Sequence, residues 1–445
     1  MKSANQHYNA RYILALCFIS ALGGYLFGFD FAVISSALPF LKDQFNLNEY
    51  WEGFATASLA LGAIIGCIAA GKIANKKGRR PGLLVAAALF GISSLFMAFA
   101  PTRDLFIASR FVAGIGVGMA SMLSPLYIAE IAPAVYRGRM VAINQLTIVL
   151  GILVTSLINY SLRNSGTDAW RWMFGLGVIP SVLFFIGVLW LPESPRWLAQ
   201  MNQAEKAAGI LAKIGGEDLG NTTITEIQKS LQTVTKVNYG AVFQKNVLPA
   251  VIVGIVLAIF QQFCGINVVF NYTAIIFESI GASKDDQLLQ IVFIGSVNVV
   301  FTLFAMGLVD KIGRKPLMLL GAGMLTILYI VISQLLSVKS AAVSWFLLAA
   351  IGTYALTLAP VTWILISEIF PNKVRGTATS VAVISLWAAY FILTFTFPVL
   401  YHWLQDKTFY VYAAVCATGF VFVLKKVKET KGKTLEEMDN VFSPH

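Results

Sequence analysis

Two ionisable residues, Asp30 and Arg110, lie inside stretches of sequence that are otherwise almost wholly apolar. A charged side chain at the centre of a bilayer costs about 2.5–3.5 kcal/mol on insertion scales, and pairing with an opposite charge is the usual compensation. At about 1.5 Å per helical residue, Asp30 lies roughly 25 Å beyond Ile13 and Arg110 roughly 8 Å beyond Leu105, where their stretches begin. Because the two stretches run in opposite directions, both residues fall in the same half of the membrane, and we expect them to pair.

An intramembrane acid of this kind admits two interpretations. In the first, Asp30 binds a transported proton, and the competition between burial and the link to Arg110 changes as a cavity opens. In the second, the two residues form a static ion pair that holds two helices together. The three histidines, His7, His402 and His445, lie near a terminus or in a loop, which leaves Asp30 as the leading candidate for a proton site.

The elements that must position these residues are membrane-spanning helices. Hydrophobic residues make up 57% of the chain and charged residues 12%, with a mean hydropathy of +0.74, far outside the range of a soluble domain. Each apolar run is continuous rather than alternating, which predicts helices and excludes barrel strands. We expect twelve crossings: Ile13–Leu41, Trp51–Ala74, Pro81–Ala100, Leu105–Pro133, Met140–Leu162, Trp172–Leu191, Val247–Ile280, Leu288–Val309, Pro316–Val338, Val343–Phe370, Thr377–Leu400 and Phe409–Leu424.

The net charge of +11 resides in particular loops, which argues against a nucleic-acid partner. Basic residues gather after the second, fourth, eighth and tenth runs, so the positive-inside rule places those loops and both termini in the cytoplasm. The first run is too long for a cleavable signal peptide. Four single cysteines lie inside apolar runs and predict neither a disulfide framework nor a metal site: Cys17, Cys67, Cys264 and Cys416.

An internal repeat divides the chain in two. Asn75–Arg80 recurs as Asp310–Lys315, and Glu130–Gly138 recurs as Glu368–Gly376. Two copies of six helices in the same orientation place a binding site between them near the midplane. We therefore expect an N-terminal half over 1–192, a linker over 193–246, a C-terminal half over 247–424 and a cytoplasmic tail over 425–445. Two linker segments have the apolar spacing of short amphipathic helices: Gln203–Ile214 and Thr223–Val234.

Four motifs, in order along the chain, carry a family resemblance: Gly78–Arg80 (GRR), Pro192–Trp197 (PESPRW), Gln261–Asn267 (QQFCGIN) and Glu429–Thr434 (ETKGKT). Together they resemble the sugar porter family of the major facilitator superfamily over essentially the whole chain. The motifs are most like those of bacterial proton/sugar symporters of the xylose/proton type, and similar also to those of glucose facilitators. The resemblance implies an all-α membrane fold of two pseudo-symmetric six-helix halves, a sugar substrate and a proton as coupling ion.

The resemblance also implies roles for individual residues. Proton-coupled members carry aspartate at the position of Asp30, so Asp30 and Arg110 become the expected coupling pair. A sugar needs amides for its hydroxyls and aromatic faces for its C–H surface, although any one buried amide can instead join two helices. The substrate-binding candidates are Phe27, Gln145, Gln261, Gln262, Asn267, Asn271, Asn298, Trp363 and Trp387.

Charged residues also occupy symmetric positions at the expected cytoplasmic helix ends. We expect salt bridges between the halves that close the inner mouth in the outward-facing state and break as it opens. The alternative is ordinary topology-setting charge. The gate candidates are Arg79, Arg80, Glu130, Arg137, Glu193, Arg196, Arg314, Glu368, Arg375 and Glu429.

Departures from the family pattern leave the sugar open. Ile152 and Leu386 stand where amides occur in relatives, Asn271 stands where most have tyrosine, and Ala359 stands where glycine is common. We expect a monomeric inner-membrane carrier that takes up a hexose or pentose with a proton by alternating access, without a cofactor. A uniporter with a purely structural Asp30 would share every motif. A sensor, an enzyme or a drug carrier is disfavoured by the short tail, the lack of a converging catalytic group and the QQFCGIN motif.

Overall fold

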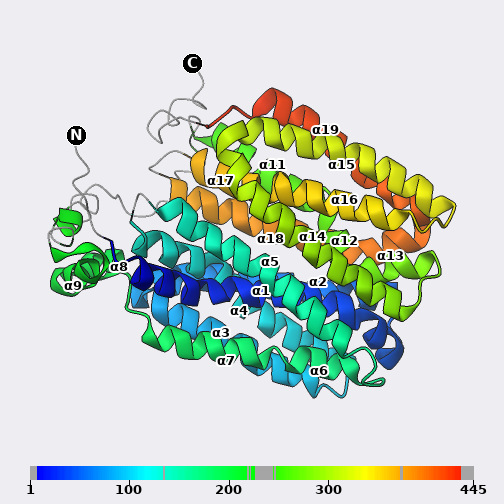
Figure 1. Cartoon of the computed structure of the whole chain (residues 1–445), viewed down its shortest axis with the longest axis horizontal. Coiled ribbons are helices and arrows are strands. Elements are labelled where there is room, and N and C mark those ends of the chain that lie inside the picture. The colour runs from blue at the N-terminus through cyan, green and yellow to red at the C-terminus, as the bar shows by residue number, and fades with distance from the viewer. Residues whose placement is uncertain are drawn as a thin grey trace.

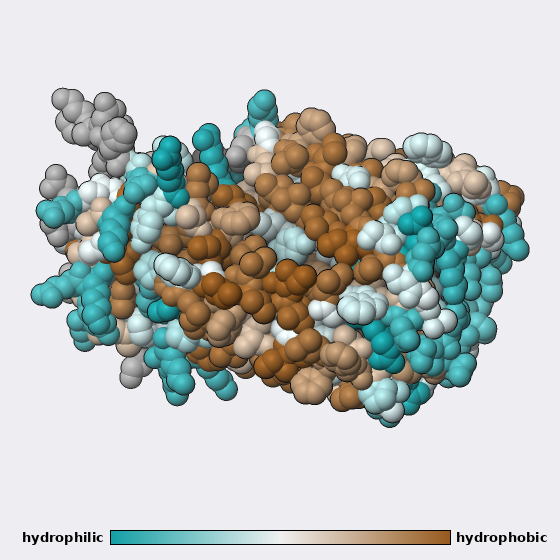
Figure 2. All heavy atoms as spheres, turned by 60° about the horizontal axis from the view of Figure 1, so that its bottom comes forward, coloured by the Kyte–Doolittle hydropathy of each residue, from teal (hydrophilic) through white to brown (hydrophobic). Residues whose placement is uncertain are grey.

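The computed structural model of the chain describes residues 8–133, 136–217, 220, 222–225, 244, 247–370 and 374–431, apart from the side chains of residues 310, 367, 375 and 376. Every regular element in these residues is a helix, as the continuous apolar runs predict. Eleven segments of the described chain are long and apolar enough to span a membrane, and one of them, Thr377–Lys426, contains two helices. The twelve predicted crossings are therefore confirmed. Figure 2 shows an apolar belt around the middle of the molecule, with hydrophilic side chains at both ends.

The chain folds into two bundles that lie side by side (Figure 1). The N-terminal half contains α1 (Ala10–Phe45), α2 (Glu49–Lys77), α3 (Arg79–Ala98), α4 (Arg103–Ile131), α5 (Arg137–Ser161), α6 (Ala169–Gly175) and α7 (Val178–Trp190). The C-terminal half contains α11 (Leu248–Phe263), α12 (Ile266–Asn271), α13 (Thr273–Ser279), α14 (Lys284–Ile312), α15 (Arg314–Ser337), α16 (Val343–Leu356), α17 (Leu358–Glu368), α18 (Arg375–Leu404), η2 (Gln405–Lys407) and α19 (Thr408–Lys426).

Two short helices, α8 (Pro195–Gln200) and α9 (Ala204–Gly215), follow the N-terminal half. The second confirms the amphipathic helix predicted over Gln203–Ile214, whereas the one predicted over Thr223–Val234 lies mostly outside the described residues. Both helices lie at one end of the bundle (Figure 1), which we call the linker end. The opposite end, where α1 ends and α2 begins, is the distal end.

Two runs that the sequence predicts as single helices are broken in the C-terminal half. The first breaks at Gly265, whose φ of +85° is left-handed and favours glycine, and again at Tyr272. The second breaks at Thr357, three residues before Pro360. Proline lacks an amide hydrogen and its ring clashes with the carbonyl four residues earlier, which favours a break there. These breaks leave short helices next to the candidate binding residues.

Backbone-to-backbone packing positions the predicted charged pair in the N-terminal half. A Cβ atom on Gly62 of α2 would lie 1.9 Å from the carbonyl oxygen of Phe111, and one on Gly114 of α4 would lie 2.0 Å from that of Leu59. Only glycine permits this approach, so α2 and α4 touch through their main chains. Arg110 lies one turn from Gly114 and is thereby held against α2.

Candidate functional site

The predicted pair of Asp30 and Arg110 is present and fully buried. Arg110 donates from Nη1 to Asp30 Oδ1 at 3.2 Å and from Nη2 to Asp30 Oδ2 at 3.1 Å. Both side chains are at most 2% exposed. Nη2 also donates to the main-chain oxygen of Thr56 at 3.4 Å, so the pair joins α1, α2 and α4. A two-bond contact between a guanidinium and a carboxylate is strong and directional, and it keeps both charges compensated away from water.

The predicted amides gather at the first helix break of the C-terminal half. Asn267 donates to Gln262 Oε1 at 2.5 Å, and Gln262 donates to Gln261 Oε1 at 3.1 Å. Positions five residues apart do not face each other on a continuous helix, but the left-handed turn at Gly265 brings α12 back against the end of α11 and places these two side chains in contact. The three amides form one buried chain of hydrogen bonds.

Aromatic rings from both halves lie between the amides and the charged pair. Phe27 of α1 contacts Trp387 of α18 with ring centroids 5.5 Å apart, and Phe31 approaches Tyr390 at 5.4 Å. Asn271 donates from Nδ2 to the Tyr390 hydroxyl at 2.8 Å, and its buried Oδ1 has no hydrogen-bond partner among the described residues. That oxygen can accept a hydrogen bond from a ligand hydroxyl. Tyr390 is also close enough to Asp30 and Arg110 for their charges to act on it.

The remaining substrate-binding candidates come from other helices and are not hydrogen-bonded to the amide chain within the described structure. Gln145 on α5 is half-buried, and Asn298 on α14 is buried. Trp363 on α17 is 40% exposed, which is unusual for a tryptophan in the middle of an apolar segment.

The gate candidates at the linker end form two matching clusters, one in each half. Arg79 binds Glu130 at 2.6 Å, and Arg314 binds Glu368 at 3.1 Å. Each of these two pairs lies within one half. In this state, these residues therefore do not form the expected salt bridges between the halves. Arg137 and Arg196 are exposed, and the side chain of Arg375 lies outside the described residues.

Two further gate candidates, Glu193 and Glu429, act as caps on helix N-termini. Glu193 accepts from the main-chain N–H groups of Arg79 and Arg80, and Arg80 also donates to the carbonyl of Leu189. Glu429 accepts from the N–H groups of Arg314 and Lys315. Carboxylates are stabilised at such termini by the unpaired N–H groups and the helix dipole. Partial burial acts to raise the pKa of Glu429, but four main-chain donors outweigh it and hold that pKa below its usual value.

The halves meet closely at the distal end. Three ion pairs join them among the described residues: Lys42–Glu278 at 3.8 Å, Asp43–Lys284 at 2.8 Å and Arg163–Asp285 at 3.5 Å. His402 Nδ1 also lies 3.2 Å from a carboxylate oxygen of Glu49. A Cβ atom on Gly53 of α2 would lie 2.3 Å from the carbonyl oxygen of Phe395 on α18. We call these contacts the distal gate, and in this structure it is closed.

Comparisons with known proteins agree with this arrangement. The profile of the family described as "Sugar (and other) transporter" matches residues 16–442. The chain belongs to this family. The D-xylose-proton symporter of Escherichia coli (strain K12) is 38% identical, with 99% of this chain and 98% of that protein covered. The arabinose-proton symporter of Bacillus subtilis (strain 168) is 35% identical over 97% of this chain and 95% of that protein.

Solved structures match this transporter over almost its whole length. The proton:xylose symporter XylE bound to 6-bromo-6-deoxy-D-glucose superposes with a TM-score of 0.84 at 38% identity, covering 98% of this chain and all of that one. The inward open conformation of XylE from E. coli gives a TM-score of 0.85 at 37% identity, covering 97% of this chain and all of that one. The fold is that of the major facilitator superfamily, and the chain is a transporter rather than an enzyme.

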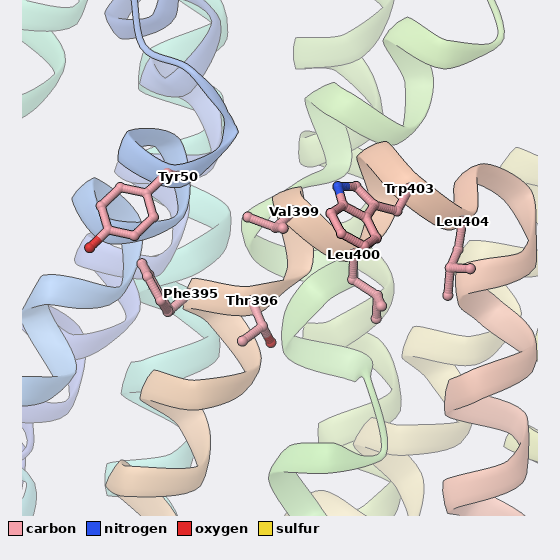
Figure 3. Close-up of a pocket in the computed structure, with 7 residues that line it drawn as sticks. All are labelled: Tyr50, Phe395, Thr396, Val399, Leu400, Trp403 and Leu404. Carbon is pink, nitrogen blue, oxygen red and sulfur yellow. The ribbon is translucent and has the colours of Figure 1, made fainter.

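An apolar groove of about 440 Å³ on this transporter lies outside the predicted site. Figure 3 shows Tyr50 of α2 facing Phe395 and the last turns of α18 at the distal end. The lining contains none of the predicted charged or amide residues, so the groove is not the predicted sugar site.

Two polar residues that lie next to the predicted site residues were not predicted from the sequence. Tyr390 lies one helical turn after Trp387, a spacing that puts both side chains on one face of α18. Glu52 lies just inside the second apolar run, so it carried the same signal, an ionisable residue in an apolar segment, that identified Asp30.

Proposed function

We propose that this transporter takes up a monosaccharide, a pentose or a hexose, together with a proton. The observation that carries the proposal is the position of the Asp30–Arg110 pair, which reaches the amide-bearing α12 through Tyr390 and Asn271. A buried acid linked to a polar, ring-lined site is what coupling of a proton to a sugar requires. The similar transporters described as D-xylose-proton and arabinose-proton symporters support the same assignment.

The linker end faces the cytoplasm in this proposal, because the basic loops lie there. The transporter is then in an inward-facing state, closed at the distal gate. Protonation of Asp30 from outside weakens its link to Arg110, sugar binds between the halves, and the distal gate closes over it. Sugar leaves inward, the proton follows, and the empty carrier returns. We further propose that the chain works as a monomer in the inner membrane, with both termini in the cytoplasm.

Proton coupling supplies free energy from the membrane potential, which facilitated diffusion does not. One charge crossing a potential of about 100 mV gains about 2.3 kcal/mol, which corresponds to roughly 50-fold accumulation without a pH gradient. A uniporter gains nothing from the potential. The two-bond geometry of the buried pair is also compatible with a static link between α1 and α4, so the uniporter remains the alternative to be tested.

The test is proton movement in proteoliposomes on addition of single sugars, from a panel of pentoses, hexoses and inositol. We expect one class of sugar to make the outside medium more alkaline with the wild type, and the signal to vanish in Asp30→Asn. Asp104→Asn, which changes an exposed carboxylate at the start of α4, is the matched control and keeps the signal. Sugar entry without a pH change in any of the three proteins would make the chain a uniporter.

A further inference from the structure

A third buried charge in the membrane-spanning bundle, Glu52, has no assigned role. Its side chain is 5% exposed, and its Oε1 atom has no hydrogen-bond partner among the described residues. The Nζ atom of Lys42 lies 4.0 Å from that oxygen, beyond hydrogen-bonding distance. An ionised carboxylate buried in this way loses its hydration without a compensating donor, which is costly.

The groups that face Glu52 come from both halves and are mostly acidic or neutral. Lys42 of α1 is the cation, while Glu49 of its own helix and Glu278 of α13 are acids. Tyr272, at the break between α12 and α13, is also within electrostatic range. Lys42 is shared, since it lies 3.8 Å from Glu278 as well.

The other helices packed against α2 direct their charges elsewhere. His402 of α18 binds Glu49, and Arg103 of α4 covers the ring of Trp51 at 3.5 Å. Arg110 of α4 is committed to Asp30. Among the described residues, Lys42, whose side chain is 42% exposed, is therefore the cation shared by the buried Glu52 and by Glu278.

Glu52 lies close to the buried pair along α2, and its main chain, not its carboxyl group, takes part in the hydrogen bonds there. The Thr56 hydroxyl donates to the main-chain oxygen of Glu52 at 2.9 Å, and Arg110 donates to the main-chain oxygen of Thr56. Glu52 thus lies one turn of α2 nearer the distal end than the residue that contacts Arg110. Its position is between the distal solution and the Asp30–Arg110 pair.

We propose that Glu52 is a second proton-binding site, which takes up a proton from the distal solution when the distal gate closes and returns it when the gate opens. Glu278 belongs to the C-terminal half, so gate closure brings this like charge to Glu52 and excludes water from it. A protonated, neutral Glu52 then avoids both the repulsion by Glu278 and the cost of burying a charge away from water. On opening, Glu52 regains water and its charge. No net proton crosses the membrane at this site, but the closing of the gate depends on distal pH.

The direction of the pH dependence of gate closure follows from proton linkage. Because the closed state binds one more proton than the open state, acid in the distal solution favours closure and alkali favours opening. One linked proton changes the ratio of closed to open gates by up to about tenfold per pH unit in the range where it titrates. The inference depends on the gate alone and not on the proposed sugar or on coupling through Asp30.

The experiment measures the distance across the gate between spin labels on the full-length transporter in lipid, with cysteines introduced at the exposed residues Gln44 and Trp403. The four native cysteines are at most 3% exposed, which keeps them from the label. We expect the closed population to fall as pH rises in the wild type, and in an Asp30→Asn background as well. Glu52→Gln removes most of the dependence, while Asp104→Asn, which changes an exposed carboxylate paired only within α4, retains it.

A second variant protects the test against misfolding of Glu52→Gln. Lys42→Gln removes the cation that favours the charged acid, so the pH range over which the closed population falls moves upward, while loss of the Lys42–Glu278 pair lowers that population at every pH. An unchanged pH profile in both Glu52→Gln and Lys42→Gln would overturn the proposal. If Asp30→Asn, with Glu52 intact, abolished the pH dependence of the closed population, that result would also overturn the proposal and would assign the effect to the coupling pair.

Discussion

The two halves of the transporter have the same number of crossings but pack by different means. In the N-terminal half, several glycines face the main-chain oxygen of a neighbouring helix in that half: Gly24, Gly28, Gly62, Gly66, Gly114 and Gly118. In the C-terminal half, the nearest atoms to four buried glycines belong to side chains: Gly254, Gly321, Gly352 and Gly419. Main-chain contacts cannot adjust, whereas side chains can change rotamer.

The helices themselves follow the same division. The charged pair lies on α1 and α4, which are unbroken, while the amides lie at the broken join of α11 and α12. A rigid frame suits a buried ion pair, because its energy depends steeply on geometry. Short helices at a break can move locally around a ligand. We infer that the N-terminal half holds the charge while the C-terminal half provides most of the local movement.

The largest expected effect is the removal of one charge from the rigid half. Arg110→Met leaves Asp30 buried and unpaired, which should lower the free energy of unfolding by about 3–5 kcal/mol. Adding Asp30→Asn should recover most of that loss. Arg314→Met removes the arginine of a partly exposed pair and should cost about 1 kcal/mol or less. Denaturation in mixed micelles measures all three, and equal losses for Arg110→Met and Arg314→Met would contradict the comparison.

The packing difference predicts unequal effects of the same small substitution. Gly62→Ala forces α2 and α4 apart and should destabilise by about 1–3 kcal/mol. Gly352→Ala meets only the ring of Phe301, at 3.2 Å, and gains helix propensity of about 0.5–1 kcal/mol, so it should be close to neutral. Melting temperatures in detergent compare the two variants. A stable Gly62→Ala protein would show that the N-terminal half is not rigid there.

Breaking the left-handed turn should sharpen the assignment of the amides. Gly265→Ala strains a residue at φ +85° by about 1–2 kcal/mol and brings a Cβ atom within 2.6 Å of the Tyr412 ring. Because Gln262 and Asn267 flank this turn, substrate affinity should weaken. Gly216→Ala is the control, since its φ is +90° but no atom lies within 4 Å. Equilibrium binding of the transported sugar tests this, and equal affinities in both variants would separate the amides from the binding site.

The smallest effect concerns the cap of the C-terminal half. The pKa of Glu429 is below its usual value, so its ionised form stabilises the folded chain above about pH 4.5 and the contribution is lost as pH falls through the lowered pKa. Glu429→Gln should therefore melt slightly lower than the wild type at pH 7. The difference should disappear in acid. A difference that persists at low pH would assign the effect to packing rather than to charge.

The sequence predicts the parts of this molecule that depend on position along a helix. The meeting of Asp30 with Arg110 follows from two runs in opposite directions, and the linker helix α9 follows from its periodicity. Contacts that depend on a local break do not follow, because Gly265 has no spacing signal of its own in an apolar run. The Gln262–Asn267 hydrogen bond was missed for that reason.

Pairing partners at the linker end were equally inaccessible from the sequence. The repeat shows that Arg79 and Glu130 correspond to Arg314 and Glu368, but not whether each arginine reaches across the interface or stays in its own half. Glu52 lies inside an apolar run as Asp30 does, yet its burial depends on side chains from the other half. Neighbours of this kind are set by tertiary packing and not by periodicity.

The caps formed by Glu193 and Glu429 have a mechanical consequence. Each carboxylate comes from the segment just after the last crossing of its half and fastens the third helix of that same half, like a clasp that closes a ring. Because each cap lies within one half, the two halves can rock against each other without breaking either cap. The contacts that must change during transport are therefore those at the interface between the halves.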